Sequence, residues 1–261
     1  MADRNLAPQT LSGASPRLLL PDLVFIVTAW LCSLSSRNKG EGNPTMSLQT
    51  DLLEEYLEQH SSQEPAELRR LRREAHVHLL QPRMLSGHLQ GRLLKMLVQL
   101  VNPRNVLELG TYTAYASLCL AEGLQNPSAR VHTIEHNDEM EDFIHRSLAL
   151  SPFGDRVVVH IGDALEVMQE LLTQHPFDLV YIDADKRHYP SYYQLLIPAL
   201  PSQALILADN TLWDGKVLQS PPPKDAQTQG ILDFNDLVAG DPRVEVVMLP
   251  LRDGLTLIRK R

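Results

Sequence analysis

Acidic residues and glycines follow several of the strands that the sequence predicts in its second half. Glu135 ends one predicted strand, Asp183 follows another, and Asp209-Asn210 follow a third. Ligands of open parallel sheets bind at the carboxyl ends of the strands, where these residues lie. A sheet with a purely structural role does not need carboxylates at neighbouring strand ends, so the pattern indicates a binding site.

The two later strand ends offer oxygen ligands for a metal ion. Asp183, Asp209 and Asn210 supply two carboxylates and an amide, and oxygen-only ligands suit Mg²⁺, Mn²⁺ or Ca²⁺ rather than Zn²⁺. Lys186 lies three residues after Asp183. As an ammonium it would favour a phenolate, and with a lowered pKa it could accept the phenol proton. The alternative is that Asp209-Asn210 only makes a turn and that Lys186 forms a surface ion pair.

The end of the first predicted strand, in VLELGTYTAYAS, fits a cofactor that carries no phosphate. Gly110 allows a sharp turn and a close approach of a ligand to the backbone, but the G-x-G-x-x-G pattern of a dinucleotide site is absent. Glu108 suits a cationic ligand. Glu135 can accept both ribose hydroxyls of an adenosine, or it is a solvated acid beside a helix start. Asp163 lies where an adenine edge would lie, or it only caps the next helix.

Outside these strand ends the indications are weaker. Trp213, in the loop after Asp209-Asn210, is a wall for an aromatic substrate or packs beneath the loop. His132 and His136 are four residues apart but fall on and after a strand, so they do not share a helix face for a zinc ion. No G-x-S-x-G nucleophile turn occurs.

Hydrophobic periodicity predicts an α/β fold, a Rossmann-like, doubly wound and mostly parallel sheet of seven strands. Strands alternate with helices through five units, and the last two strands are joined by residues too few for a crossover helix, so they should form an antiparallel hairpin. The expected strands are 105–110, 130–135, 156–161, 177–182, 204–208, 244–249 and 255–259, and the expected helices are 51–60, 67–80, 91–101, 112–124, 139–150, 164–174, 189–200 and 226–239.

Composition indicates one soluble domain. The 261 residues carry 24 Lys and Arg against 32 Asp and Glu, a net charge of −8, which argues against a nucleic-acid groove. Two cysteines exclude a disulfide framework and favour a reducing, cytoplasmic setting. Residues 18–34 are apolar but interrupted, too short for a membrane span, although they resemble a weak anchor or signal-like segment. We expect residues 1–45 to be an extension and 46–261 to be the folded domain.

From residue 46 to 261 the chain resembles the metal-dependent, caffeoyl-CoA O-methyltransferase-like family, which is related more distantly to catechol O-methyltransferase. The motifs that carry the resemblance are VLELGTYTAYAS, TIEHN, GDALEV, YIDADKRHY, ADNTLWDGKV and LRDGLTL, and the combination of YIDADK with ADNTLWDGKV is specific. The resemblance implies an S-adenosylmethionine-dependent O-methyltransferase that acts on a vicinal dihydroxy aromatic molecule with a divalent metal, Mg²⁺ first. Family members are commonly homodimers.

The resemblance also assigns roles to residues of this chain. It implies that Asp183, Asp209 and Asn210 bind the metal, that Lys186 and Asp183 are catalytic, and that Asp183 and Asp214 contact substrate, beside Trp213. The positions that it places at S-adenosylmethionine are Glu108, Gly110, Thr111, Glu135, Ala164 and Asp185, with Ser86 and Ser117 as further candidates.

Two departures leave other functions open. The family's first motif usually has glycine where Ala114 stands and serine where Ala116 stands, with Ser117 next door. These changes affect the expected cofactor affinity more than the fold. They keep a non-catalytic protein with the same fold as an alternative, although Asp183 and Lys186 are intact. A nicotinamide-dependent oxidoreductase is a second alternative, and the missing G-x-G-x-x-G pattern speaks against it.

Overall fold

The computed structural model describes residues 44–261, with side chains from Leu52 onward. The chain divides into two compact units, residues 1–53 and 54–261. The described part of the first unit is the start of helix α2 (Pro44–Gln59), which begins two residues before the expected start of the folded domain at residue 46. The expectations for the apolar segment at 18–34 lie outside the described residues. No helix among residues 44–261 is long and apolar enough to cross a membrane.

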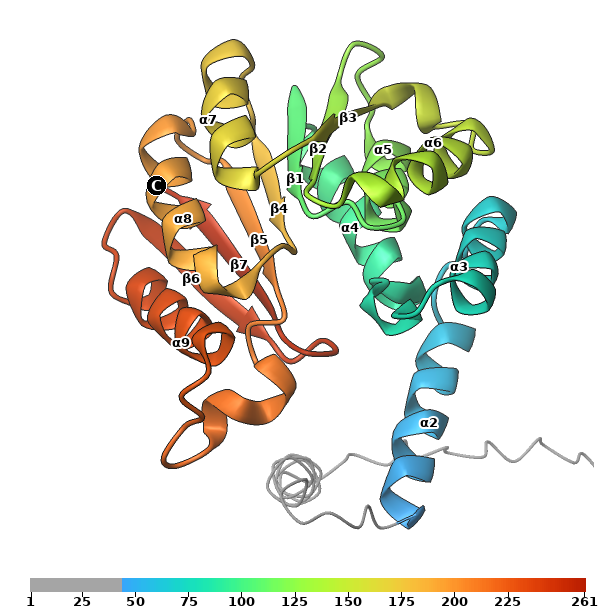
Figure 1. Cartoon of the computed structure of the whole chain (residues 1–261), viewed down its shortest axis with the longest axis horizontal. Coiled ribbons are helices and arrows are strands. Elements are labelled where there is room, and N and C mark those ends of the chain that lie inside the picture. The colour runs from blue at the N-terminus through green and yellow to red at the C-terminus, as the bar shows by residue number, and fades with distance from the viewer. Residues whose placement is uncertain (1–43) are drawn as a thin grey trace, which may run out of the picture. The chain divides into compact units, whose positions relative to one another are not determined.

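The second unit is built on one seven-stranded sheet in the order β3-β2-β1-β4-β5-β7-β6 (Figure 1). Strands β1 to β5 are parallel to their neighbours, whereas β7 runs antiparallel to both β5 and β6. This confirms the predicted mostly parallel sheet with an antiparallel C-terminal hairpin. The strands are β1 (Asn105–Leu109), β2 (Arg130–Glu135), β3 (Val157–Ile161), β4 (Leu179–Ile182), β5 (Leu205–Asp209), β6 (Val244–Leu249) and β7 (Leu255–Lys260).

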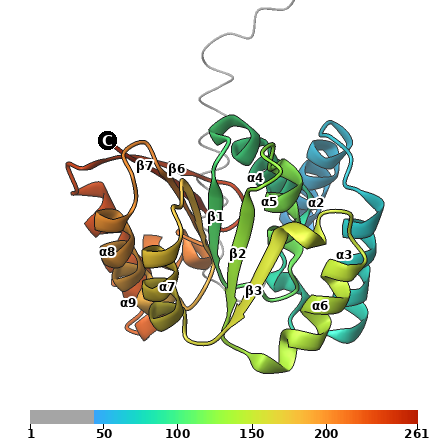
Figure 2. The same ribbon diagram turned by 90° about the horizontal axis from the view of Figure 1, so that it is seen from above.

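Helices cover both faces of this sheet, as Figure 2 shows for α7, α8 and α9 on one side and α4, α5 and α6 on the other. Each face has its own apolar core, one beneath α3 to α6 and one beneath α7 to α9. Burial on both faces explains why the central strands read as continuous apolar runs. The helices are α3 (Ala66–His78), α4 (Gly87–Val101), α5 (Tyr115–Gly123), α6 (Glu141–Ala149), α7 (Ala164–Gln174), α8 (Tyr189–Ala199) and α9 (Ala226–Ala239).

Two of the helix starts that differ from the prediction lie at the candidate site. Helix α4 begins at Gly87, one turn before the predicted Gly91, so Ser86 stands directly at its start. Helix α5 begins at Tyr115 rather than Tyr112. The reason is that Tyr112 and Ala114 have positive φ angles of 50° and 65°, which an α-helix does not allow.

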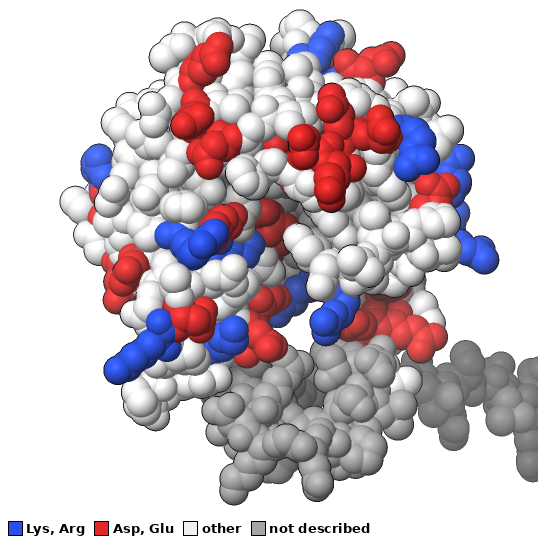
Figure 3. All heavy atoms as spheres, in the orientation of Figure 1, with Lys and Arg blue, Asp and Glu red and all other residues white. Residues whose placement is uncertain are grey.

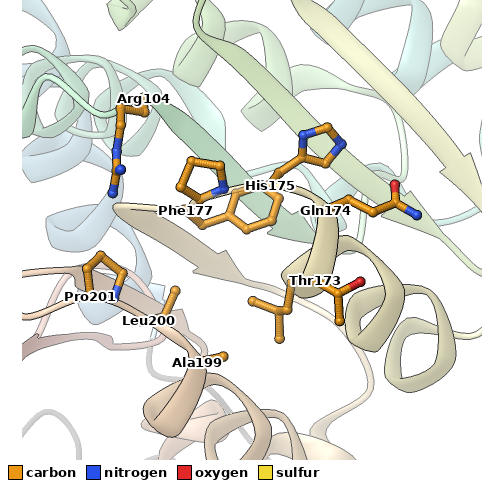
Figure 4. A pocket seen from close by; sticks show the side chains of 10 residues that line it. Arg104, Thr173, Gln174, His175, Phe177, Ala199, Leu200 and Pro201 are labelled. Carbon is orange, nitrogen blue, oxygen red and sulfur yellow. The ribbon is translucent and has the colours of Figure 1, made fainter.

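The surface of the described residues gives little support for other kinds of site. On the face drawn in Figure 3, basic and acidic side chains are interspersed, and no broad basic patch covers the described part. A pocket of about 350 Å³, bordered by Thr173, Phe177 and Leu200, lies where β4 begins (Figure 4). It is at the opposite edge from the strand ends, and its one arginine, Arg104, is already paired with Asp178 at 2.7 Å. We therefore do not consider it the functional site.

Candidate active site

The parallel pairing of β4 with β5 brings the two predicted metal-binding strand ends together. Ile182 is in register with Ala208, so Asp183 and Asp209 occupy the next, neighbouring positions. The Tyr189 hydroxyl confirms the closeness because it donates to the backbone carbonyl of Ile182 at 3.1 Å and of Asp209 at 3.0 Å. The side-chain carboxyl of Asp183 is partly exposed, and Asp209 is buried.

Lys186 lies beside these carboxylates and is buried. Its Nζ donates to Asp183 Oδ1 at 2.8 Å and to the Tyr189 hydroxyl at 2.9 Å. Burial alone would lower the pKa of Lys186, but the negative charge of Asp183 and the contact with Tyr189 outweigh it and raise the pKa above its usual value. The possibility of a lysine with a lowered pKa is therefore wrong for this ion-paired arrangement, and the ammonium form is the one that the site favours.

Asp209 is held by two residues that the sequence analysis did not single out. Its Oδ2 accepts hydrogen bonds from Gln90 Nε2 at 2.6 Å and from the Tyr181 hydroxyl at 2.7 Å. Gln90 comes from α4, which reaches over the strand ends. The sequence could have pointed to Gln90 through its position. It falls on the apolar stripe of α4, with Leu94 and Val98 at i+4 and i+8, where a polar side chain is unusual.

The donors at this edge suit a hard cation. Burial raises the pKa of Asp209, the nearby charge of Asp183 raises it further, and Lys186 works against both. A divalent cation would relieve this crowding of carboxylates, and the carboxylate and amide oxygens are ligands that Mg²⁺ and Ca²⁺ accept. Among residues 52–261 no group of three or more His, Cys, Asp and Glu side chains is arranged to hold a metal ion. The predicted set differs in composition, since its third member is Asn210.

The turn after β1 is shaped by close packing of two backbones. Gly110 has φ +95°, and a Cβ at this position would lie 2.1 Å from the carbonyl oxygen of Asp183. No side chain is compatible with that distance. Gly110 also donates its N–H to Ile134 at 2.9 Å, and Asp183 donates its N–H to Leu109 at 2.8 Å. The first and fourth strand ends, which carry the predicted cofactor and metal residues, are therefore fixed against each other.

Glu108 is fully buried beneath this turn. Burial raises the pKa of Glu108 to about 8, although hydrogen bonds from Ser117 and Thr133 lower it. The Ser117 hydroxyl donates to Glu108 Oε2, while Oε1 has no partner among the described residues. The Thr111 and Thr133 hydroxyls are 2.6 Å apart. Ser117 and Thr111 thus direct their hydroxyls into the protein, and their predicted contact with a cofactor stays a prediction.

Glu135 sits at the end of β2 and organises the neighbouring loops. Its two oxygens accept the N–H groups of Tyr112 at 2.7 Å and Asn137 at 2.9 Å. A carboxylate has about four acceptor positions, so two remain for the ribose hydroxyls of the predicted cofactor.

Two predicted residues cap short helices. Asp163 accepts the N–H groups of Leu165 at 2.8 Å and Glu166 at 3.3 Å, which places Ala164 as the first residue of α7. The cap alternative for Asp163 is thereby confirmed. Asp185 starts the short 3₁₀ helix Lys186–His188 and pairs with the Arg187 guanidinium, which lowers the pKa of Asp185. A cofactor would have to share Asp185 with this arginine.

Ser86 and the segment before α4 are tied to the β6–β7 turn. The guanidinium of Arg252 donates to the backbone carbonyls of Leu85, at 2.8 Å, and Ser86. The Ser86 hydroxyl lies 3.3 Å from the Tyr181 hydroxyl. The predicted closing segment is therefore in contact with the same edge of the sheet as Asp209.

Trp213 and Asp214 lie in the loop after β5. Trp213 is partly buried against the core beneath α7 to α9, and its Nε1 has no hydrogen-bond partner among the described residues. The ring therefore packs beneath the loop, as one alternative had it, and its role as a wall for an aromatic substrate stays a prediction. Asp214 is exposed, and its backbone N–H donates to Asp253 Oδ1.

The sequence and the fold of this chain are similar to those of known methyltransferases. A family model described as O-methyltransferase matches residues 58–261. A caffeoyl-CoA O-methyltransferase of Petroselinum crispum is 32% identical over 227 residues, 82% of this chain and 92% of that protein. An O-methyltransferase from Bacillus cereus, solved in complex with SAH, superposes with a TM-score of 0.74 at 28% identity over 80% of this chain and 97% of that one. The O-methyltransferase TomG from Streptomyces achromogenes, solved in complex with SAM, superposes with a TM-score of 0.71 at 28% identity, over 80% of this chain and 95% of that one.

The sheet order, the turn at Gly110 and these likenesses define a class, the class I S-adenosylmethionine-dependent O-methyltransferases with a Rossmann-like fold. Within that class the chain belongs to the caffeoyl-CoA O-methyltransferase family. The family implies a small-molecule methyl acceptor.

Proposed function

We propose that this enzyme transfers the methyl group of S-adenosylmethionine to one hydroxyl of a catechol-like acceptor, with a divalent metal, Mg²⁺ first, at Asp183, Asp209 and Asn210. The observation that carries the proposal is the pair of neighbouring strand ends, where Asp183 and Asp209 lie side by side with the Lys186 ammonium 2.8 Å from Asp183. An acceptor with two adjacent oxygens matches this edge of the sheet, because a metal ion there and the Lys186 ammonium would both attract negative oxygen atoms.

The bound metal would supply Lewis acidity that lowers the pKa of the acceptor hydroxyl. Lys186 keeps its proton, so it acts as a fixed cation that attracts the phenolate oxygen rather than as a base. Asp183 and Tyr189 hold that ammonium in place through hydrogen bonds of 2.8 and 2.9 Å. The acceptor hydroxyl would lose its proton to solvent water, and its oxygen would then take the methyl group from the sulfur of S-adenosylmethionine as the carbon–sulfur bond breaks, which would release S-adenosylhomocysteine. Positioning and charge supply most of the rate in such a transfer.

The cofactor would lie along the ends of β1 to β3. In this proposal Glu135 and the turn at Gly110 would bind the ribose and the methionine portion, and Ala164 would lie at the adenine edge. Ser86 and the segment before α4 would close over it, and Glu108, Thr111, Ser117 and Asp185 would support the site from the positions described above. On the substrate side, Trp213 and Asp214 would border the aromatic acceptor. We further propose a homodimer, for which the exposed Met96 and Leu100 of α4 offer an apolar surface.

A methyl-transfer assay with labelled S-adenosylmethionine tests the proposal. Catechols should be methylated with added Mg²⁺, matched monophenols should not, and excess chelator should stop turnover. Asp183→Ala should lower turnover by about two orders of magnitude or more and leave S-adenosylhomocysteine binding within about twofold. Asp155→Ala, an exposed aspartate in the 3₁₀ turn before β3, is the control. Full turnover of Asp183→Ala, or turnover unaffected by chelator, would exclude the metal role.

A further inference from the structure

Three polar side chains form a buried cluster between α4, β4 and β5. Gln90 and Tyr181 are fully buried, and Asp209 is 3% exposed. Gln90 Nε2 donates to the Tyr181 hydroxyl at 2.9 Å and to Asp209 Oδ2 at 2.6 Å, and the Tyr181 hydroxyl donates to the same Oδ2 at 2.7 Å. The three groups therefore close a ring of hydrogen bonds on one oxygen of the carboxylate.

This ring leaves the two carboxylate oxygens of Asp209 with different numbers of free acceptor positions. Each carboxylate oxygen has about two acceptor positions, and on Oδ2 both are taken by Gln90 and Tyr181. Within the part of the chain that the structure describes, Oδ1 accepts one hydrogen bond, from the backbone N–H of Asn210 at 2.8 Å. One lone pair remains, and it is on Oδ1. A cation that binds Asp209 in its present orientation would therefore bind through that oxygen alone.

Gln90 stabilises the fold no better than an apolar residue would at this position. Its Oε1 is buried with no hydrogen-bond partner among the described residues, and an unpaired buried carbonyl costs stability. The residue sits on the apolar stripe of α4, where leucine would pack without that cost. The contacts that distinguish Gln90 from leucine are those of its amide nitrogen to Tyr181 and Asp209.

We propose that Gln90 and Tyr181 are positioning residues that hold Asp209 with Oδ2 turned inward and Oδ1 presented to the metal ion. The proposal rests on the metal site of the proposed function. Residues that orient a metal ligand in this way change metal affinity by about 10- to 100-fold when they are removed. Among the described residues neither side chain forms a hydrogen bond with a side chain at the ends of β1 to β3, where the cofactor is proposed to bind. The Tyr181 hydroxyl lies 3.3 Å from the Ser86 hydroxyl on the cofactor side, whereas Gln90 has no hydrogen bond there. Cofactor affinity should therefore change little in either variant, and least in Gln90→Leu.

Metal affinity and cofactor affinity can be measured separately. Mn²⁺ binding is measured as loss of the free-ion signal in electron paramagnetic resonance. Tyr181→Phe and Gln90→Leu should each weaken Mn²⁺ binding by about 10-fold or more, with S-adenosylhomocysteine binding, measured by calorimetry, within about twofold of the parent. Tyr193→Phe is the matched control, because Tyr193 is also buried and its hydroxyl donates to an aspartate, Asp241, at 2.8 Å, which is not part of this cluster.

The results distinguish the two proposals. If the parent binds Mn²⁺ and Tyr181→Phe binds it equally well, the positioning role is overturned and the metal site stands. If the parent does not bind Mn²⁺ at all, the metal site and the positioning role both fall. Should Gln90→Leu not fold, the near-isosteric Tyr181→Phe decides alone. Equal loss of affinity in Tyr193→Phe would mean a general effect of the missing hydroxyl and would also overturn the positioning role.

Discussion

At the scale of single residues, the fold changes the acid–base properties of side chains that the sequence presents as ordinary. Glu108 is buried beneath the turn after β1, and burial raises its pKa from an ordinary 4.5 to about 8. The pKa of Lys186 is also raised, but by its ion pair with Asp183, which works against burial and keeps the ammonium protonated. Both effects depend on the folded surroundings of the side chain, and both set which protonation state is available to a ligand.

Glu108→Gln should remove a pH dependence of stability. Between pH 4.5 and about 8 the folded protein keeps the proton on Glu108 while the unfolded chain has lost it, so stability falls as pH rises, by up to about 1.4 kcal/mol per pH unit. Urea unfolding of the cofactor-free protein at pH 5, 6, 7 and 8 measures this slope. The slope should persist in Glu139→Gln, which changes an exposed carboxylate. An unchanged slope in Glu108→Gln would contradict the assignment.

At the scale of elements, short turns decide where the site residues stand. The turn between β1 and α5 takes three positive φ angles, at Gly110, Tyr112 and Ala114. The turn between β6 and β7 contacts two other segments. Arg252 donates to the segment before α4, and Asp253 accepts the N–H of Asp214 in the loop after β5. Periodicity locates these turns but does not give their backbone angles.

Ala114→Gly should stabilise the protein by about 0.5–1 kcal/mol. Ala114 is in the left-handed region at φ 65°, which costs an alanine about 1–2 kcal/mol, and part of the gain is offset by the greater freedom of glycine in the unfolded chain. For a chain of this size the gain corresponds to a rise in Tm of about 2 °C. Ala116→Gly, inside α5, is the control and should destabilise. A lower Tm for Ala114→Gly would show that the buried methyl group outweighs the backbone cost.

Arg252→Ala should weaken S-adenosylhomocysteine binding several-fold with little change in Tm. The substitution frees the Leu85 and Ser86 carbonyls and leaves the segment before α4 without its tie to the β6–β7 turn. Calorimetric titration measures the affinity. Arg259→Ala is a matched control on β7, where the arginine forms only an exposed pair with Glu245 at 3.7 Å. Equal affinities in both variants would remove Arg252 from the site.

At the scale of the whole second unit, two buried side chains, Glu108 and His132, change the stability of the fold in opposite directions as the pH changes. His132 Nδ1 lies 3.2 Å from His160 Nε2, and the His132 ring is tilted against the His175 ring with centroids 4.3 Å apart. Burial lowers the pKa of His132 to about 4, and the nearby positive charges of His175, His160 and Arg130 add to it. The unfolded chain therefore takes up this proton near pH 6.5 and the folded protein near pH 4, so stability is lost as pH falls between them.

His132→Gln should therefore make the protein less sensitive to acid. Glutamine stays neutral, so the loss of stability between pH 6.5 and 4, up to about 1.4 kcal/mol per pH unit, should shrink. Between pH 4.5 and 6.5 this loss and the gain from Glu108 act in opposite directions, and the variant Glu108→Gln should expose it most clearly. Denaturant unfolding at pH 4.5, 5.5 and 6.5 is the measurement. An acid sensitivity equal to that of the parent would rule out His132 as its cause.

The sequence by itself determined the order of strands and helices, the parallel sheet, the antiparallel hairpin and the strand ends at which polar residues gather. It could do so because apolar periodicity and residue type are local properties of the chain. It also supplied every candidate that lies at such a strand end, from Glu108 to Asp209.

Only the tertiary structure decided which groups meet. The pairing of β4 with β5 places Asp183 beside Asp209, α4 brings Gln90 to the Asp209 carboxylate, and Arg252 reaches a segment 166 residues earlier in the chain. Proton affinities such as that of Glu108 also depend on burial and on neighbours from other elements. These contacts arise from long-range packing, and no window of sequence contains the partners that make them.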